Sequence, residues 1–231
     1  MTRWLRRFAP LVVAFALAAP AGARASEDIT AIQAALAWTG HYDGPIDGRQ
    51  RPALRASVAR FQRGGGFRPT GRLSANELGQ LLAEADDARA RAGYEAFTDP
   101  RTGITIGIPR ALTPQMQQSE QGTRFASDDN RVGIELVRLP GTGLAGFREA
   151  IMAGHPGLRV TYTAGGRGWY VVTGFIDDRQ FYSRARLDGA GLAAFAVTYD
   201  GELERLVEPA IVAMSSAFAR PHILSLLTPP R

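Results

Sequence analysis

The chain has 231 residues, of which 45% are hydrophobic and 21% are charged, so its composition is that of a globular protein and excludes a disordered or collagen-like chain. All 27 basic residues are arginine, against 22 acidic residues, and the formal net charge is +5. Cysteine is absent, which excludes disulfide bonds, thiolate zinc sites, a cysteine nucleophile and a lipid-modified cysteine.

Residues 1–25 have the features of a secretory signal peptide. Three arginines precede an apolar run over residues 8–19, and Ala23-Arg24-Ala25 forms an A-x-A cleavage site. We therefore expect export, by the general or the twin-arginine route, and cleavage after Ala25, with no membrane anchor left behind. Cleavage leaves 23 arginines against 22 acidic residues, and this balance argues against binding to nucleic acid or membrane by bulk charge.

Apolar residues recur with helical spacing between residues 28 and 92. The spacing predicts three short helices, around residues 29–36, 54–61 and 78–82. Pro52 suits the first turn of the second helix, and Ser74 and Glu77 have the spacing of a capping box that opens the third. We interpret the charged, alanine-rich residues 84–93 as a linker that extends the third helix.

The segment 28–83 contains motifs in a characteristic order. Residues 42–48 read Tyr-Asp-Gly-Pro-Ile-Asp-Gly, Phe61-Gln62 ends the second helix, and residues 70–73 read Thr-Gly-Arg-Leu. Together with Ile32-Gln33 upstream, this segment resembles the three-helix peptidoglycan-binding-like domain of exported cell-wall enzymes. The resemblance implies a small all-α domain over residues 26–83 and peptidoglycan as its partner. The sequence departs from the family at Arg51 and Leu54, where members usually carry Gly and Thr, so the loop beside any ligand differs in shape.

Several motif residues have a structural role that needs no ligand. Glycines in the 42–48 turn allow positive φ, proline fixes φ, and Asp43 and Asp47 can accept backbone N–H groups that stiffen the turn. Phe61 and Leu73 fit a small helical core. The residues assigned to the fold motif are Gly44, Pro45, Gly48, Phe61, Gln62, Thr70, Gly71 and Leu73.

The surface beside the 42–48 turn is the predicted ligand site. Seven arginines and no acidic residue lie between Gly48 and Asn76. Guanidinium groups match carboxylates, which peptidoglycan stem peptides carry, although a solvated arginine face is equally consistent. Tyr42 suits a sugar ring, and a Tyr42 packed against the first helix is equally consistent. The candidate ligand-binding residues are His41, Tyr42, Asp43, Asp47, Arg49, Arg51 and Arg55.

From Tyr94 onward the apolar period changes to two. Alternation predicts strands at residues 104–108, 132–136, 159–163, 169–175, 181–187 and 192–199. Short Gly and Asp turns between the last four indicate an antiparallel meander, and amphipathic helices are expected at 144–151 and 203–218. The expected fold is therefore multidomain, with an all-α three-helix domain followed by an α+β domain over residues 94–220. Pro221 should end the last helix and leave residues 221–231 as a loose tail.

The second half shows no recognisable catalytic set. Residues 141–146 match G-x-G-x-x-G, but no acidic ribose partner follows about 20 residues on, so we interpret them as a loop that starts a helix. The histidines lack zinc-hydrolase spacings, and neither metal nor cofactor is expected. The prediction is an exported, noncatalytic peptidoglycan-binding protein, periplasmic or secreted. Two alternatives stay open. The first is a hydrolase with an acid pair among Glu135, Glu149, Asp177 and Asp178, and the second is a periplasmic adaptor whose N-terminal domain has lost wall affinity and which contacts another envelope protein through residues 94–220.

Overall fold

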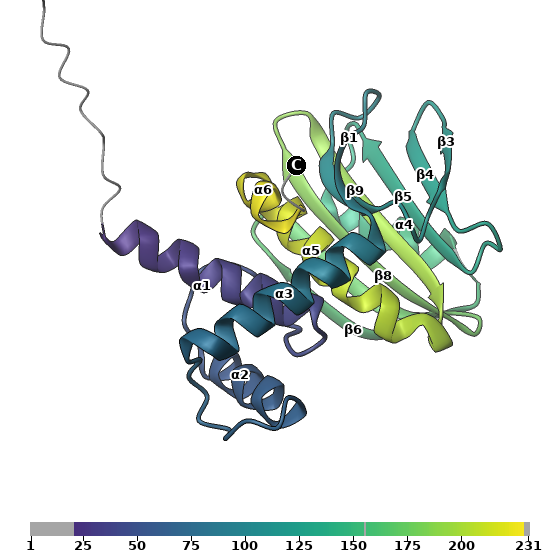
Figure 1. Cartoon of the computed structure of the whole chain (residues 1–231). Helices are drawn as coiled ribbons and strands as arrows, with labels where there is room; N and C mark the ends of the chain where they lie inside the picture. Colours follow the sequence, from purple (N-terminus) through teal and green to yellow (C-terminus); the bar gives the residue numbers. More distant parts are fainter. Residues whose placement is uncertain (1–20, 155, 229–231) are drawn as a thin grey trace, which may run out of the picture.

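The computed structural model describes residues 21–154 and 156–228, with helices first and a large sheet after them (Figure 1). The first three helices are α1 (Ala21–Trp38), α2 (Pro52–Gly64) and α3 (Ala75–Ala92). Residues 1–20 of the predicted signal peptide lie outside the described residues. The expected cleavage point after Ala25 falls inside α1, so cleavage there would remove the first residues of this helix.

The starts of α2 and α3 follow from the local sequence. Pro52 stands at the start of α2, where its missing N–H is no loss. At the start of α3 the Glu77 N–H donates to Ser74 Oγ at 3.4 Å and the Ser74 N–H donates to Glu77 Oε2 at 2.6 Å, which completes the predicted capping box. The helix continues through the predicted linker and ends at Gly93, where φ is 56°.

The second half consists mainly of antiparallel strands. Within the described residues β1 and β2 form a hairpin, and a seven-stranded sheet has the order β3-β4-β5-β9-β8-β7-β6. The strands are β1 (Tyr94–Thr98), β2 (Thr105–Pro109), β3 (Gln115–Gln118), β4 (Gly122–Ala126), β5 (Val132–Leu139), β6 (Leu158–Gly166), β7 (Trp169–Ile176), β8 (Arg179–Asp188) and β9 (Gly191–Asp200).

One helix packs on each face of this sheet. α4 (Leu144–Gly154) carries the chain from β5 to the far edge, where β6 begins, and the meander of β6 to β9 returns to pair with β5. After β9 a 3₁₀ turn (Gly201–Leu203) leads into α5 (Glu204–Ala219). Because side chains alternate along a strand, Phe195 and Val197 of β9 share a core with α5, whereas Ala194 packs in a smaller cluster with Phe147 of α4.

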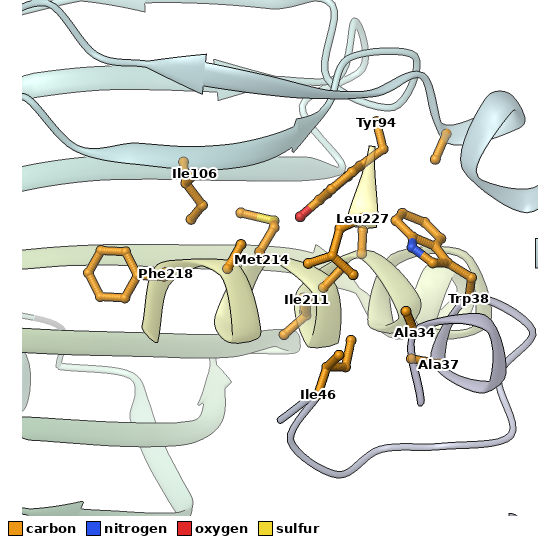
Figure 2. Close-up of a cluster of buried hydrophobic side chains, with 14 of the residues drawn as sticks. Ala34, Ala37, Trp38, Ile46, Tyr94, Ile106, Ile211, Met214, Phe218 and Leu227 are labelled. Carbon is orange, nitrogen blue, oxygen red and sulfur yellow. The ribbon is translucent and has the colours of Figure 1, made fainter. Parts of the chain in front are cut away.

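The helical part and the sheet share one hydrophobic core (Figure 2). Trp38, at the end of α1, contacts Tyr94 of β1 edge-on, with ring centroids 4.9 Å apart. Ile46, from the turn after α1, is fully buried and belongs to the same cluster as Ile211 and Met214 of α5. The side chains at this junction are therefore mutually buried, and separating residues 26–83 from the rest would expose them to water.

The C-terminal segment also joins this core. α5 ends at Ala219, before Pro221, as predicted. The expectation of a loose tail is wrong for residues 221–227, which form a 3₁₀ turn (Pro221–Ile223) and the short helix α6 (Leu224–Leu227). Ile223, Leu224 and Leu227 are buried, and the Leu226 carbonyl accepts a hydrogen bond of 3.0 Å from Arg89 Nη1 of α3. Burial of these three apolar side chains explains why the segment packs.

The predicted fold class is confirmed: helices come first, and an antiparallel meander with two further helices follows. Three strands, β1, β3 and β4, were not predicted. β3 has all four side chains exposed, so no alternation of apolar and polar residues marks it. Residues 141–143 form the loop that starts α4, as the sequence suggests.

Candidate ligand-binding site

Tyr42 is part of the core and does not face a ligand. Its side chain is 4% exposed, and its hydroxyl donates to the Pro45 carbonyl at 3.0 Å. The ring lies so close to Gly44 that a Cβ there would overlap it, so glycine is required for this packing. The proposed role of Tyr42 as a platform for a sugar ring therefore has to be corrected, and the packed alternative holds.

His41 has a similar structural role. Its ring packs edge-on against Phe61 of α2 with the centroids 5.6 Å apart, and its Nδ1 lies 3.0 Å from Thr39 Oγ1. Burial lowers the pKa of His41, and the Arg60 guanidinium adds to this effect while Glu84 opposes it. A neutral, half-buried imidazole against a phenyl ring stabilises the contact between α1 and α2.

Asp47 is the centre of a hydrogen-bond network beneath the turn. Its side chain is 2% exposed, and Arg51 donates to both carboxylate oxygens, at 2.7 and 2.5 Å. The Arg49 N–H donates to Oδ1 at 3.0 Å. Burial alone would raise the pKa of Asp47, but the hydrogen bonds from Arg51, Arg49 and Gln33 outweigh it and lower the pKa to about 2. Asp47 therefore holds Arg51 in place and is not itself free to bind.

The stability of the protein should consequently fall in acid through Asp47. Its folded pKa of about 2 lies below the ordinary 3.8, so the carboxylate contributes stability that is present above pH 4 and lost as the pH falls through 2. The shift corresponds to about 2 kcal/mol. We expect the difference in unfolding free energy between wild type and Asp47→Asn to shrink by that amount between pH 5 and pH 2, measured by urea unfolding. Exposed Asp43→Asn is the control, and an equal change there would contradict the assignment.

Two buried glutamines fix the loops on either side of α2. Gln33 of α1 accepts the Asp47 and Gly48 N–H groups at Oε1, both at 2.8 Å, and donates from Nε2 to the Arg49 carbonyl at 3.0 Å. Gln62 of α2 accepts the Gly71 N–H at 2.9 Å and donates to the Arg72 carbonyl at 2.8 Å. Both side chains are fully buried, so their amides take the place of water for these backbone groups.

The two loops meet at an open pocket of about 610 Å³, which we call the arginine pocket. Gly71, with φ of 69°, lets its loop lie against α2, since a Cβ there would sit 3.1 Å from the Arg55 carbonyl oxygen. Arg55 and Arg72 are exposed, and Arg51 is half-buried by its bonds to Asp47. The lining residues are Gln50, Arg51, Pro52, Arg55, Gly71 and Arg72.

The charge of the arginine pocket suits an anionic ligand. Three guanidinium groups line it, no acidic residue does, and only Arg51 has a carboxylate partner, in Asp47, among the described residues. Guanidinium groups bind carboxylates through paired hydrogen bonds. The pocket brings together two of the predicted residues, Arg51 and Arg55, and adds Arg72, which is not among the residues predicted from the sequence.

The remaining predicted residues lie around this pocket or away from it. Arg49 is exposed on the neighbouring loop but does not line the pocket, and Asp43 is exposed beside α5. Thr70 accepts a bond of 3.2 Å from Gln62 Nε2, so it belongs to the scaffold, as do buried Phe61 and half-buried Leu73. The sequence marks Gln33 only as part of the family motif, yet its side chain organises the predicted turn.

Glu135 is the one of the four carboxylates considered for hydrolysis that lines a described pocket. Glu135 lies on β5, 3.9 Å from Arg124, and the two pockets that it lines contain none of Glu149, Asp177 and Asp178. Asp177 has a positive φ of 53° in the turn between β7 and β8. Glycosidases need two carboxyl groups across one cleft, and neither of these two pockets pairs Glu135 with another of the four.

The comparisons with known proteins concern mainly the helical part of the chain. Residues 25–81 match the family described as "Putative peptidoglycan binding domain", in line with the resemblance that the sequence motifs indicate. Localization factor PodJL of Caulobacter vibrioides, from two strains, is 43% identical over 68 residues, which cover 29% of this chain and 7% of that protein. The chain thus matches only a small part of this long relative.

The solution structure of cyanobacterial PsbP (CyanoP) from Synechocystis sp. PCC 6803 is similar at a TM-score of 0.39 and 10% identity. That similarity covers 54% of this chain and 91% of the cyanobacterial one. Among the described residues there is no helix of the length and apolar character needed to cross a membrane.

Proposed function

We propose that this chain is an exported, noncatalytic protein that binds peptidoglycan, and that the arginine pocket takes the carboxylates of the stem peptides. The family match over residues 25–81 supports the choice of polymer. The observation that carries the proposal is the pocket itself, in which Arg51, Arg55 and Arg72 meet without an acidic lining residue. The leader over residues 1–25 and the wall polymer as ligand together favour the periplasm or the cell exterior as its location.

Several features prepare this pocket for binding. Asp47 orients Arg51 through two hydrogen bonds, and Gln33 and Gln62 fix the loops on both sides. A ligand carboxylate therefore meets donors that are already ordered, which reduces the entropy lost on binding. The departure from the family at Arg51 adds a cation where most members have glycine, so we assign Arg51 to ligand positioning rather than to loss of affinity.

Charge reversal in the pocket should abolish most of the binding. We expect Arg55→Glu with Arg72→Glu to weaken sedimentation with purified sacculi by at least about tenfold, since each replaces a charge-assisted hydrogen bond with repulsion. Both side chains are exposed, so circular dichroism should show an unchanged fold. The assay uses the mature full-length chain because the helical part shares its core with the sheet.

Arg63→Glu with Arg68→Glu is the matched control. These two arginines are exposed in the same segment and do not line the pocket, so the change in net charge is identical. Equal losses in both pairs would indicate bulk attraction, and unchanged binding of the pocket variant would remove the arginine pocket from the site. Release of muropeptides by the wild-type protein would instead favour the hydrolase alternative, and retention by an envelope protein but not by sacculi would favour the adaptor.

A further inference from the structure

A second depression lies between the turn after α1 and the sheet, and both halves of the chain build it. Figure 1 shows this turn beside α5 and near the β6 edge of the sheet. The depression has a volume of about 450 Å³, and we call it the composite groove. The side chains that matter here are Asp43 from the turn, Tyr162 of β6, Trp169 of β7, Tyr182 and Arg184 of β8, and Arg220 after α5.

The wall of the composite groove is firmly attached to α5. The Ile46 N–H donates to Ser216 Oγ at 3.2 Å, and Arg220 Nη1 donates to the Ile46 carbonyl at 3.3 Å. Ile46 itself is fully buried in the shared core. These bonds hold the turn against α5 before any ligand arrives, and this order favours binding.

Aromatic rings line the sheet side of the groove. Tyr162 is 58% exposed, and Trp169 is half-buried. In the β6–β7 register Trp169 pairs with Gly166, where a Cβ would come within 2.6 Å of the indole, so the absence of a side chain at Gly166 makes room for the ring. Rings with an apolar body and a polar tip suit a ligand that is apolar on its ring faces and polar at its edges.

Hydrogen-bonding groups stand beside these rings. Tyr182 Oη and Arg184 Nη1 each lie 2.7 Å from Ser215 Oγ, which fixes both side chains along the groove. The Arg184 guanidinium also lies over the Trp169 ring, 5.5 Å from its centroid. The bond to Ser215 uses one of the five N–H donors of Arg184, so others are available to amide and hydroxyl oxygens of a ligand. Asp43 adds an exposed acceptor on the opposite wall.

We propose that the composite groove binds a strand of N-acetylated hexosamines, so that it takes the glycan while the arginine pocket takes the stem peptide. Sugar rings would pack on Tyr162 and Trp169, and Arg184 would donate to acetamido or hydroxyl oxygens. The choice of polymer rests on the proposed function, but the groove is a different surface from the arginine pocket, with no lining residue in common.

The test uses the β-1,4-linked tetramer of N-acetylglucosamine, which has neither peptide nor charge. We expect the mature full-length chain to bind it in calorimetric titration, and Tyr162→Ala to weaken this binding by about tenfold. Met152→Ala is the control, because Met152 is 54% exposed on α4, the helix on the other face of the sheet. The Met152→Ala variant should bind the tetramer with the affinity of the wild type. Trp169→Phe is a second variant, which keeps an aromatic ring at this position and should retain most of the affinity for the tetramer.

The two proposals fail separately. The variant with both Arg55→Glu and Arg72→Glu should bind the tetramer as wild type does, but it should no longer bind sacculi. If wild type fails to bind the tetramer at millimolar concentration, or if Tyr162→Ala binds it as Met152→Ala does, the groove proposal is wrong even if the arginine pocket is required for sacculi. If an isolated stem peptide displaces the tetramer, the groove is a peptide site and the proposal is equally overturned.

Discussion

Replacing Gly107 with alanine should destabilise the protein by about 3 kcal/mol, because overpacking a rigid core forces rings and backbone out of place. Gly107 lies in β2, directly beneath the ring of Tyr94, and a Cβ there would overlap the phenol. The ring cannot easily move, since Tyr94 is 1% exposed and Trp38 packs edge-on against it. Tyr94 lies at the junction of the helical part and the sheet, so the strain falls on the shared core. Urea unfolding followed by circular dichroism measures the loss.

A matched glycine and a double-mutant cycle test this explanation. Gly79 lies in α3, and no neighbouring atom lies within 4 Å of the place that an added Cβ would take, so Gly79→Ala should instead add about 0.5–1 kcal/mol of stability through helix propensity. In a Tyr94→Ala background the space above Gly107 is open, and Gly107→Ala should then cost less than about 0.5 kcal/mol. A cost that stays the same in that background would show that the clash with Tyr94 is not the cause.

Local features of the fold were predictable because their causes are local. The capping box at Ser74 needs only residues three apart, and Pro52 needs only its own ring, so the sequence alone indicates both helix starts. Alternation likewise located β5 and the strands from β6 to β9. β4 was missed because four of its five residues are buried, so the expected alternation is lost.

Contacts between distant segments could not be predicted in this way. Ile46 bonds to Ser216, 170 residues further along the chain, and nothing in the periodicity of either segment indicates that pairing. Tyr42, by contrast, is buried through local contacts, with its ring against Gly44 and its hydroxyl on the Pro45 carbonyl. The apolar side chains of α6 are visible in the sequence, but their burial depends on a surface made by α1, α5 and the β1–β2 hairpin.

The sequence predicts the kind of ligand that the candidate site suits, but only some of the residues that line it. A run of arginines with no acidic residue among them indicates a ligand that carries carboxylates, and Arg51 and Arg55 do line one pocket. Arg72 is in the same run, but its place at the pocket depends on Gln62, which draws the loop before α3 toward α2. The composite groove involves five elements, the turn after α1, β6, β7, β8 and the end of α5, so no single motif in the sequence could reveal it.

Replacing Gln62 with leucine should cost about 3 kcal/mol of stability and also weaken binding to sacculi. Leucine has a similar volume but no amide, so the Gly71 N–H loses its partner, as does Oε1 of buried Glu77, 3.1 Å from Gln62 Nε2. The Arg72 carbonyl keeps only the hydrogen bond of 3.0 Å from Thr70 Oγ1. Each buried polar group left without a hydrogen bond costs about 1–3 kcal/mol. Because Gln62 holds the loop that carries Arg72, the arginine pocket should lose one of its walls.

Gln80→Leu is the control for this substitution. Gln80 is exposed on α3 and donates to Glu84 Oε1 at 2.9 Å, so its replacement should change the unfolding free energy by less than about 0.5 kcal/mol. Sacculi binding is compared at a temperature at which circular dichroism shows Gln62→Leu to be folded, so that weaker binding reports the displaced loop and not the unfolded fraction. If the folded Gln62→Leu protein bound sacculi as tightly as Gln80→Leu does, the position of Arg72 would not matter for the ligand, and the pocket would reduce to Arg51 and Arg55.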